Sequence, residues 1–385
     1  MHSDNEVRSR VVELTKALIR IPSENPPGDQ KPIADFIENE IKRIGLQVER
    51  YDYEHNKPNV LGRLVGRDKR PILMLNGHVD TVPAGDAKRW STNPFDPVEK
   101  DGRLYGRGAS DMKGGIAAMI CAAEEIVDAG LDLRGTLLLA CVVDEEVTGF
   151  GTRDILEKGC MSDFAIVAEP TDLKVQIAHK GALGLEILTK GRPYHASEPR
   201  KGMNAVYKMS RVCLALAEYQ GELEKITHPL VGAASISVGR IEGGTARNVV
   251  PESCRIEAER RILPGEKKEN VLSSLESVFR RLEDEDNELE LEYHVLLECE
   301  PSQTSPDSLI VKKSLEAVSN VIGEPAVPSG TKGTTDMRFL VNQAGIPTVN
   351  LGPGNCPHVI DEYVETQQLL DSTKAYCLVA EKLLA

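Results

Sequence analysis

The stretch Pro71-Ile-Leu-Met-Leu-Asn-Gly-His-Val-Asp80 runs from a short apolar segment directly into a histidine and an aspartate. Three further apolar runs of similar length occur at 136–143, 164–168 and 346–351. Short apolar runs that alternate with helical patterns are typical of parallel strands buried on both faces of a sheet. We therefore predict an α/β fold with a mostly parallel sheet.

Helical periodicity fills the segments between these runs. The N-terminal segment has Val7, Val11, Leu14, Leu18 and Ile21 at three- and four-residue steps. This spacing indicates an amphipathic helix and not the continuous apolar core of a signal peptide. We expect further helices at 32–44, 116–127, 308–322 and 366–384.

The middle of the chain has a different pattern. Extended segments at 182–190, 234–241, 251–261 and 288–298 alternate with helical stretches at 204–219 and 269–283. This α+β pattern predicts a separate domain inserted into the α/β domain. We expect residues 1–181 and 297–385 to form a discontinuous catalytic, metal-binding domain, and residues 182–296 to form the inserted domain.

Composition excludes some classes of partner. The 385 residues include 46 Lys and Arg against 60 Asp and Glu, a net charge of −14. An acidic chain without a long basic run is a poor candidate for binding nucleic acid or anionic membranes. No stretch approaches the ~20 apolar residues of a membrane span. The 8 scattered cysteines predict reduced thiols in a cytoplasmic protein.

Metal-competent side chains follow the apolar runs. His78 and Asp80 follow the first, Glu145 and Glu146 the second, and Glu169 the third. His358 comes shortly after the last run, and Asp111 lies in a glycine-rich turn before a predicted helix. Because ligands of open α/β sheets gather beyond the carboxyl ends of the strands, we expect these side chains to meet.

The types of donor atom limit which metal ions are candidates for this site. Imidazole and carboxylate groups without thiolates suit Zn²⁺, with Co²⁺ or Mn²⁺ as alternatives. Asp80 is placed to bond the second ring nitrogen of His78 and orient it. A spare carboxylate, Glu145 or Glu146, is a candidate general base.

Five motifs together resemble the dinuclear zinc family of acetylornithine deacetylase, succinyl-diaminopimelate desuccinylase, aminoacylase and glutamate carboxypeptidase. They are NGHVDTVP, YGRGASDMKGG, VVDEE, VAEPT and Gly352-Pro-Gly354 with His358. The resemblance implies two divalent metal ions per chain, bridged by Asp111. It assigns His78 and Glu169 to one metal, and Glu146 and His358 to the other. Glu145 would then be the general base and Asp80 the orienting residue.

The resemblance extends to the inserted segment, which it implies is a lid that also forms a homodimer. GRPYHASEPRKGMNA places His195 where relatives carry a histidine that reaches the partner subunit's active site. GGTARNVVPESC and ERRILPG supply Asn248 and Arg261 as substrate-binding residues. The neighbouring Arg260 is an alternative to Arg261, since only the spacing of the family motif separates them.

The predicted reaction is removal of an acyl group, of acetyl or succinyl type, from an N-acyl amino acid or diamino acid by a two-metal-activated water. The resemblance suggests that deacylases carry Glu at the position of Glu169 and that many peptidase branches carry Asp there, which favours a deacylase. A dipeptidase or carboxypeptidase acting on short peptides is the alternative. A non-catalytic binding homologue is disfavoured because Glu145 is present. The acyl group, the amine, the native metal and the pathway are left open.

Overall fold

The computed structural model describes residues 2–385, and the chain divides into two compact units. The first unit comprises Met1–Ile177, Thr304–Gly330 and Thr335–Ala385, and the second Ala178–Gln303 and Thr331–Thr334. The expected inserted segment, 182–296, lies inside the second unit. Its roles as lid and dimer contact stay predictions.

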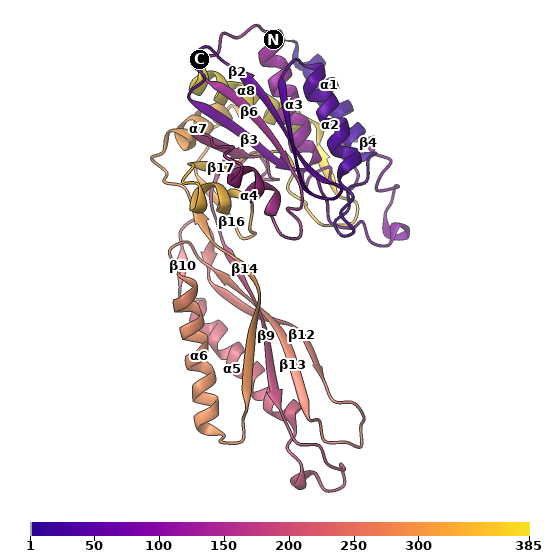
Figure 1. Cartoon of the computed structure of the whole chain (residues 1–385), viewed down its shortest axis with the longest axis vertical. Coiled ribbons are helices and arrows are strands. Elements are labelled where there is room, and N and C mark those ends of the chain that lie inside the picture. Colours follow the sequence, from indigo (N-terminus) through magenta and orange to yellow (C-terminus); the bar gives the residue numbers. More distant parts are fainter. Residues whose placement is uncertain (1) are drawn as a thin grey trace. The chain divides into compact units, whose positions relative to one another are not determined.

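A nine-stranded sheet organises the first unit, with the strand order β1-β2-β6-β3-β7-β17-β8-β15 and β16 paired to β8 (Figure 1). The four strands β6, β3, β7 and β17 run parallel to one another, and the flanking pairs are antiparallel. The strands are β1 (Gln47–Glu54), β2 (Lys57–Val65), β3 (Ile72–His78), β6 (Thr136–Val142), β7 (Phe164–Val167), β8 (Gln176–His179), β15 (Ser302–Gln303), β16 (Ser329–Thr331) and β17 (Thr348–Asn350). A smaller sheet joins β4 (Val98–Lys100), β5 (Arg103–Tyr105) and β18 (Tyr363–Glu365).

Both faces of the parallel strands are buried, as their apolar sequences predict. Every residue of β6 is buried. Met74 of β3 packs into a cluster with Ile155, which follows β6 in the chain, and Leu340, which precedes β17. Leu73 and Leu75, also buried, point to the other face because side chains alternate along a strand. Because these strands are parallel, their carboxyl ends meet at one edge of the sheet.

Helices cover the sheet. Helices α1, α3 and α8 pack against one another, and α3 and α8 also contact β3. The helix α1 begins with a capping box, in which Ser3 and Glu6 satisfy each other's backbone N–H groups. The helices of this unit are α1 (Asp4–Ile19), α2 (Lys31–Arg43), α3 (Lys113–Asp128), α4 (Phe150–Glu157), α7 (Leu309–Ile322) and α8 (Thr366–Leu384), with the short turns η1 (Ala87–Arg89) and η3 (Phe339–Gln343).

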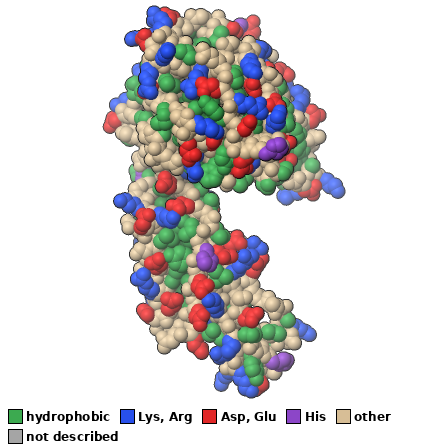
Figure 2. Space-filling model, in the orientation of Figure 1, with side chains coloured by type: hydrophobic (Ala, Val, Ile, Leu, Met, Phe, Trp, Pro, Cys, Tyr) green, Lys and Arg blue, Asp and Glu red, His purple; other side chains and the backbone are tan. Residues whose placement is uncertain are grey.

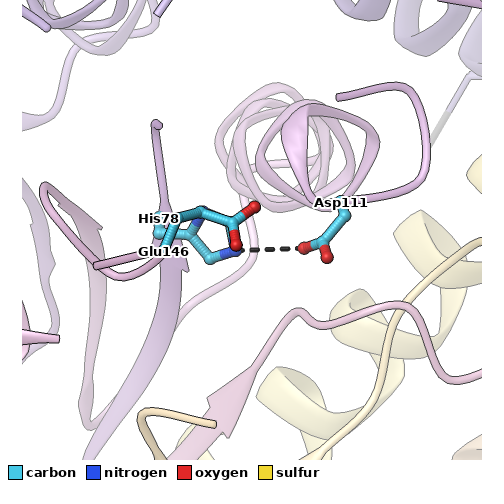
Figure 3. Close-up of side chains that lie close together, drawn as sticks. All are labelled: His78, Asp111 and Glu146. Carbon is cyan, nitrogen blue, oxygen red and sulfur yellow. Dashed lines mark hydrogen bonds and ion pairs between the residues drawn. The ribbon is translucent and has the colours of Figure 1, made fainter. Parts of the chain in front are cut away.

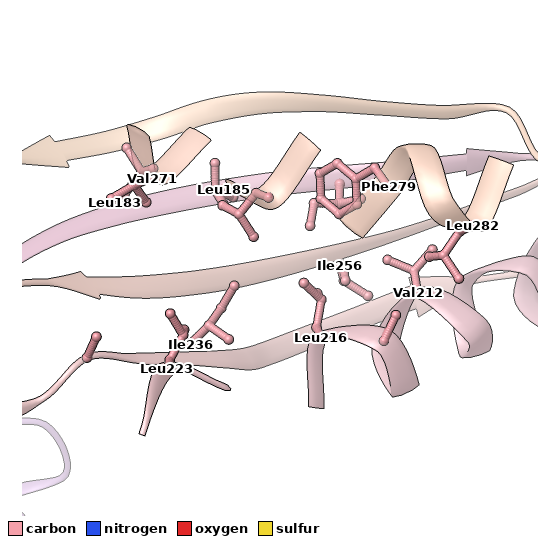
Figure 4. Packing of buried hydrophobic residues seen from close by; sticks show 14 of the residues in the cluster. Leu183, Leu185, Val212, Leu216, Leu223, Ile236, Ile256, Val271, Phe279 and Leu282 are labelled. Atoms are coloured by element: carbon pink, nitrogen blue, oxygen red, sulfur yellow. The ribbon is translucent and has the colours of Figure 1, made fainter. Parts of the chain in front are cut away.

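The second unit is a four-stranded antiparallel sheet in the order β12-β13-β9-β14, with two long helices packed on it. Its core joins Leu185 and Ile256 of the sheet to Leu216 and Phe279 of the helices (Figure 4). Its elements are β9 (Gly181–Lys190), η2 (Pro199–Lys201), α5 (Ala205–Leu223), β10 (Thr227–His228), β11 (Gly232–Ala233), β12 (Ser235–Gly243), β13 (Ser253–Ile262), α6 (Lys268–Glu285) and β14 (Leu291–Cys299).

The predicted fold class, a mostly parallel α/β sheet together with an α+β segment, is confirmed. Sequence reasoning missed the helix α4 and the short strands β4, β5, β8, β15, β16 and β18. Within residues 2–385, no helix is long and apolar enough to cross a membrane. On the face shown in Figure 2, acidic and basic side chains are interspersed.

Candidate metal centre

His78 is the last residue of β3, and the strand presents its imidazole at the sheet edge. The side chain is only 2% exposed. Its Nδ1 lies 3.0 Å from the carbonyl oxygen of Asp80, which can only accept a hydrogen bond. Nδ1 therefore carries the hydrogen, and the Nε2 lone pair faces Oδ1 of Asp111 at 3.1 Å. Two acceptors at this distance require a proton or a cation between them.

Asp111 lies in the turn before α3 and faces two imidazoles. Its Oδ1 is 3.1 Å from His78 Nε2, and its Oδ2 is 3.2 Å from His358 Nε2. Burial raises the pKa of Asp111, but the contacts with His358 and His78 outweigh burial and hold that pKa below its usual range. Each carboxylate oxygen of Asp111 thus lies next to a different histidine.

Glu146 follows β6 and completes a compact donor group. One ligand atom from each of His78, Asp111 and Glu146 lies within 4.8 Å of the others (Figure 3). Glu146 Oε2 also lies 3.0 Å from His358 Nε2. Two ligands about 2.0–2.2 Å from one zinc lie roughly 3.3 Å apart, so the 3.1 Å between His78 and Asp111 and the 3.0 Å between Glu146 and His358 fit pairs of donors that share a cation.

His358 reaches this group from the loop after β17. It has a positive φ of 63°, and about half of its side chain, 51%, is exposed. Hydrogen bonds with Asp111 and Glu146 raise the pKa of His358 to about 10, against the opposing effect of burial. A proton on the His358 ring lies where a bound cation would neutralise the carboxylates of Asp111 and Glu146.

Glu145, which is partly buried, and Glu169, which is buried, are carboxylates next to this group. Among residues 2–385, neither carboxylate has a hydrogen-bond or ion-pair partner. Burial raises the pKa of Glu145 to about 8. Burial, followed by the charge of Asp111, raises the pKa of Glu169 well above its usual value. Enclosing carboxylates without partners is costly unless they are protonated or a cation is bound, so these residues also fit a metal centre.

Asp80 differs from the expected orienting contact. Its carboxylate oxygen is 3.6 Å from Nδ1 of His78, and the backbone carbonyl of Asp80 takes that ring hydrogen. The carboxylate instead accepts the N–H groups of Glu145 and Glu146, at 3.1 and 3.2 Å, and an amide N–H of Asn25 at 2.9 Å. Asp80 therefore holds the loop that carries the two glutamates.

Residues that hold the metal-centre loops were not found by sequence reasoning. Asn25 donates to both Asp80 and Asp144, and Lys57 forms an ion pair with Asp144. Glu362 accepts the N–H groups of Ser110 and Asp111. In a single sequence nothing distinguishes Asn25, Lys57 or Glu362 from ordinary surface residues.

The other predicted site residues belong to the second unit. His195 is exposed and contacts Ser197 Oγ through Nδ1 at 2.7 Å. It forms an isolated bridge with Val249, and the exposed Asn248 accepts the N–H of Ala196 through its carbonyl at 2.9 Å. His195 and Asn248 thus lie on two loops that are bonded to each other.

The two candidate arginines point to opposite faces of β13, because side chains alternate along a strand. Arg260 is 1% exposed, and its guanidinium lies 2.7 Å from Glu266. Arg261 is 32% exposed and lies 2.7 Å from Glu259. Arg260 is therefore committed to the interior of the unit, and Arg261 is the arginine accessible to a ligand.

Comparisons with known proteins show the family of the chain. The model of peptidase family M20/M25/M40 matches residues 74–382. N-formyl-4-amino-5-aminomethyl-2-methylpyrimidine deformylase of Bacillus subtilis is 30% identical, over 96% of this chain and 93% of that protein. Succinyl-diaminopimelate desuccinylase of Marinobacter nauticus is also 30% identical, over 98% and 99%.

Among solved structures, aminopeptidase PepT of Bacillus cereus superposes with a TM-score of 0.79 at 21% identity, covering 97% of this chain and 98% of that one. At this identity the likeness shows the fold alone. The family match includes all five candidate ligands and the segments that carry His195, Asn248 and Arg261, and it confirms the family resemblance of the motifs. The chain belongs to peptidase family M20/M25/M40.

Proposed function

We propose that this protein is a metal-dependent amidohydrolase that removes an acyl group, of acetyl, succinyl or similar type, from an N-acyl amino acid or diamino acid. One observation carries the proposal: the two oxygens of Asp111 face two different imidazoles, at 3.1 and 3.2 Å. This is the arrangement expected of a carboxylate that bridges two metal ions.

The donor set supports two divalent cations per chain, Zn²⁺ in our proposal, with Co²⁺ or Mn²⁺ as alternatives. His78 and Glu169 would hold one ion and Glu146 and His358 the other, with Asp111 shared. Cations bound there would polarise the amide carbonyl and lower the pKa of water.

The chain's own residues would move the proton and hold the substrate. Glu145 is a partly buried carboxylate without a committed partner, which suits a group that takes a proton from the attacking water and returns it to the leaving nitrogen. Arg261 would hold a substrate carboxylate through its planar fork. Asn248 and His195 would bind the carbonyl oxygens, with His195 stabilising the developing negative charge.

A homodimer through the second unit is part of the proposal. The strand β12 is an edge of its sheet, so one side of its backbone is free to pair with another strand. On α5, Tyr207 and Leu214 are 72% and 67% exposed and lie seven residues apart, on one face of the helix. In this arrangement His195 would act on the active site of the partner subunit.

Deacylation is favoured over peptide hydrolysis. Two relatives at 30% identity are named as a deformylase and a desuccinylase, and Glu169 supports the same choice. A metallopeptidase acting on short peptides is the second candidate, and the structural likeness to an aminopeptidase is compatible with it. The proposed location is the cytoplasm, in keeping with eight free cysteines.

A substrate panel tests the proposal. Zinc- and cobalt-loaded protein is assayed on acetyl-ornithine, succinyl-diaminopimelate, other N-acyl amino acids including formyl derivatives, and dipeptides, with Glu145→Gln as the matched control. We expect the highest kcat/KM on an N-acyl substrate. Preference for a dipeptide would assign the peptidase function, and no hydrolysis of any amide would contradict both.

A further inference from the structure

The backbone of Asp111 is held by one buried carboxylate, that of Glu362. Glu362 is fully buried, at 0% exposure. Its Oε1 accepts the N–H of Ser110 at 2.8 Å and the N–H of Asp111 at 3.0 Å. Its own carbonyl accepts the N–H of Gly106 at 2.9 Å. The turn that presents Asp111 is therefore bonded to Glu362 at both ends.

Glu362 lies in the same loop as His358, and this loop is closely packed on Ser110. The N–H of Cys356 donates to Ser110 Oγ at 3.3 Å. Gly354 has a φ of +88°, and a Cβ there would lie 2.3 Å from Ser110 Oγ. Only glycine allows this close approach, so the loop that carries His358 and the turn that carries Asp111 form one packed assembly.

Arg107 balances the charge of Glu362. Its Nη1 lies 2.5 Å from Glu362 Oε2, and its side chain is 3% exposed. The guanidinium is 5.0 Å from the centre of the Trp90 ring, and Nη2 donates to the carbonyl of Pro83 at 3.4 Å. The ion pair keeps a charged acceptor under the Asp111 turn, where a charged hydrogen bond is stronger than a neutral one.

We propose that Glu362 is a positioning residue for metal binding, which aims Asp111 through its backbone and ties its placement to that of His358. The proposal rests on the proposed role of Asp111 as a metal ligand. Among residues 2–385, Glu362 has no hydrogen bond or ion pair with a candidate metal-donor atom, so its effect on the metals passes through the Asp111 turn. Partners of this kind typically contribute 10–100-fold to metal affinity.

The test compares Glu362→Asp with the neighbouring control Asp361→Asn. Glu362→Asp keeps the charge, but its shorter side chain cannot bond both Arg107 and the Asp111 turn. Among the described residues, the Asp361 carboxylate accepts hydrogen bonds from the N–H and hydroxyl of Ser91 alone, at 2.7 and 2.8 Å. Metal-free variants are titrated with Co²⁺ alone, following visible absorption, and their folding is checked by circular dichroism and thermal unfolding.

We expect Glu362→Asp to fold without metal, to bind Co²⁺ about 10–100-fold more weakly and to show an altered absorption spectrum. Asp361→Asn should match the unmodified protein. A merely structural role would lower the melting temperature and leave the Co²⁺ spectrum and affinity unchanged, and that result overturns the proposal. If Glu362→Asp does not fold, Arg107→Lys decides by the same measurements, with unchanged Co²⁺ binding again overturning it.

Asp111→Asn separates this proposal from the proposed function. If Asp111→Asn leaves Co²⁺ binding unchanged, the proposed metal centre itself is wrong. If Asp111→Asn weakens Co²⁺ binding and Glu362→Asp does not, only the positioning role of Glu362 is refuted.

Discussion

The candidate metal centre and the loops of the second unit that carry His195 and Asn248 differ in how they hold their side chains. In the first unit, His78, Asp111 and Glu146 are enclosed and held by their own unit through backbone and side-chain contacts. In the second unit, His195 and Asn248 are exposed on loops, and within residues 2–385 the imidazole of His195 is hydrogen-bonded to the neighbouring Ser197 alone.

This difference in exposure follows from the charges that each set of side chains carries. Clustered carboxylates and imidazoles must be arranged before a cation binds, because misplaced buried charges are costly. Polar groups that meet a substrate can wait in solvent at little cost and be organised by a conformational step or a second subunit. We therefore expect changes in the first unit to alter metal binding, and changes in these loops of the second unit to alter turnover or KM without altering metal content.

Metal removal should have the largest effect. Chelator-treated protein should lose all activity and regain it with Zn²⁺ or Co²⁺, at up to two ions per chain, because the enclosed carboxylates depend on a cation for their chemistry. Elemental analysis and the activity assay measure this together. Full activity in protein verified to be metal-free would contradict the proposed metal centre, and with it the contrast drawn between the two units.

Glu145→Gln should have the second-largest effect on activity. It removes a proton acceptor and no metal ligand, so turnover should fall about 10²–10⁴-fold while both metals stay bound. Glu146→Gln is the matched control, since it should weaken one metal. Near-normal turnover of Glu145→Gln would show that the base is assigned wrongly.

His195→Ala should lower turnover about 10²–10³-fold, the usual cost of one donor to a developing oxyanion, with metal content unchanged. Ser197→Ala, which removes only the hydroxyl partner of His195, should have a much smaller effect. Loss of bound metal in His195→Ala would contradict the division of roles between the two units.

Mixing Glu145→Gln with His195→Ala subunits sharpens the same prediction. A heterodimer combines an intact Glu145 with an intact His195 at one site only if His195 acts across the interface. We expect activity above the sum of the parents once subunit exchange is shown. Activity that stays at that sum would place His195 within its own chain or outside catalysis.

Arg261→Ala should have the smallest effect on the chemistry. Loss of a charged hydrogen bond worth about 1.5–3 kcal/mol should raise KM about 10–100-fold with little change in folding. Arg260→Ala should instead destabilise the second unit, because it leaves Glu266 without its buried partner. If Arg260→Ala changed KM and Arg261→Ala did not, the assignment of the two arginines would be reversed.

Much of the candidate site could be predicted because four of the five candidate ligands lie at or after the end of a strand, and Asp111 alone lies in a turn before a helix. His78 ends β3, Glu146 follows β6 and Glu169 follows β7, so parallel pairing alone brings their backbones to one edge. The contacts that aim these side chains could not be predicted. Asp80 was expected to bond the ring of His78 through its carboxylate, but the backbone carbonyl makes that contact, since the carboxylate is occupied by two N–H groups and an amide.

Sequence by itself determined the fold class, the family and the donor types, because apolar periodicity and short motifs are local properties of the chain. Tertiary structure decided which oxygen of Asp111 faces which histidine, which of Arg260 and Arg261 is accessible, and that Glu362 lies under the Asp111 turn. These features depend on burial and on hydrogen bonds between segments about 250 residues apart. No local pattern encodes them, because packing of the whole unit selects the partner of each buried polar group.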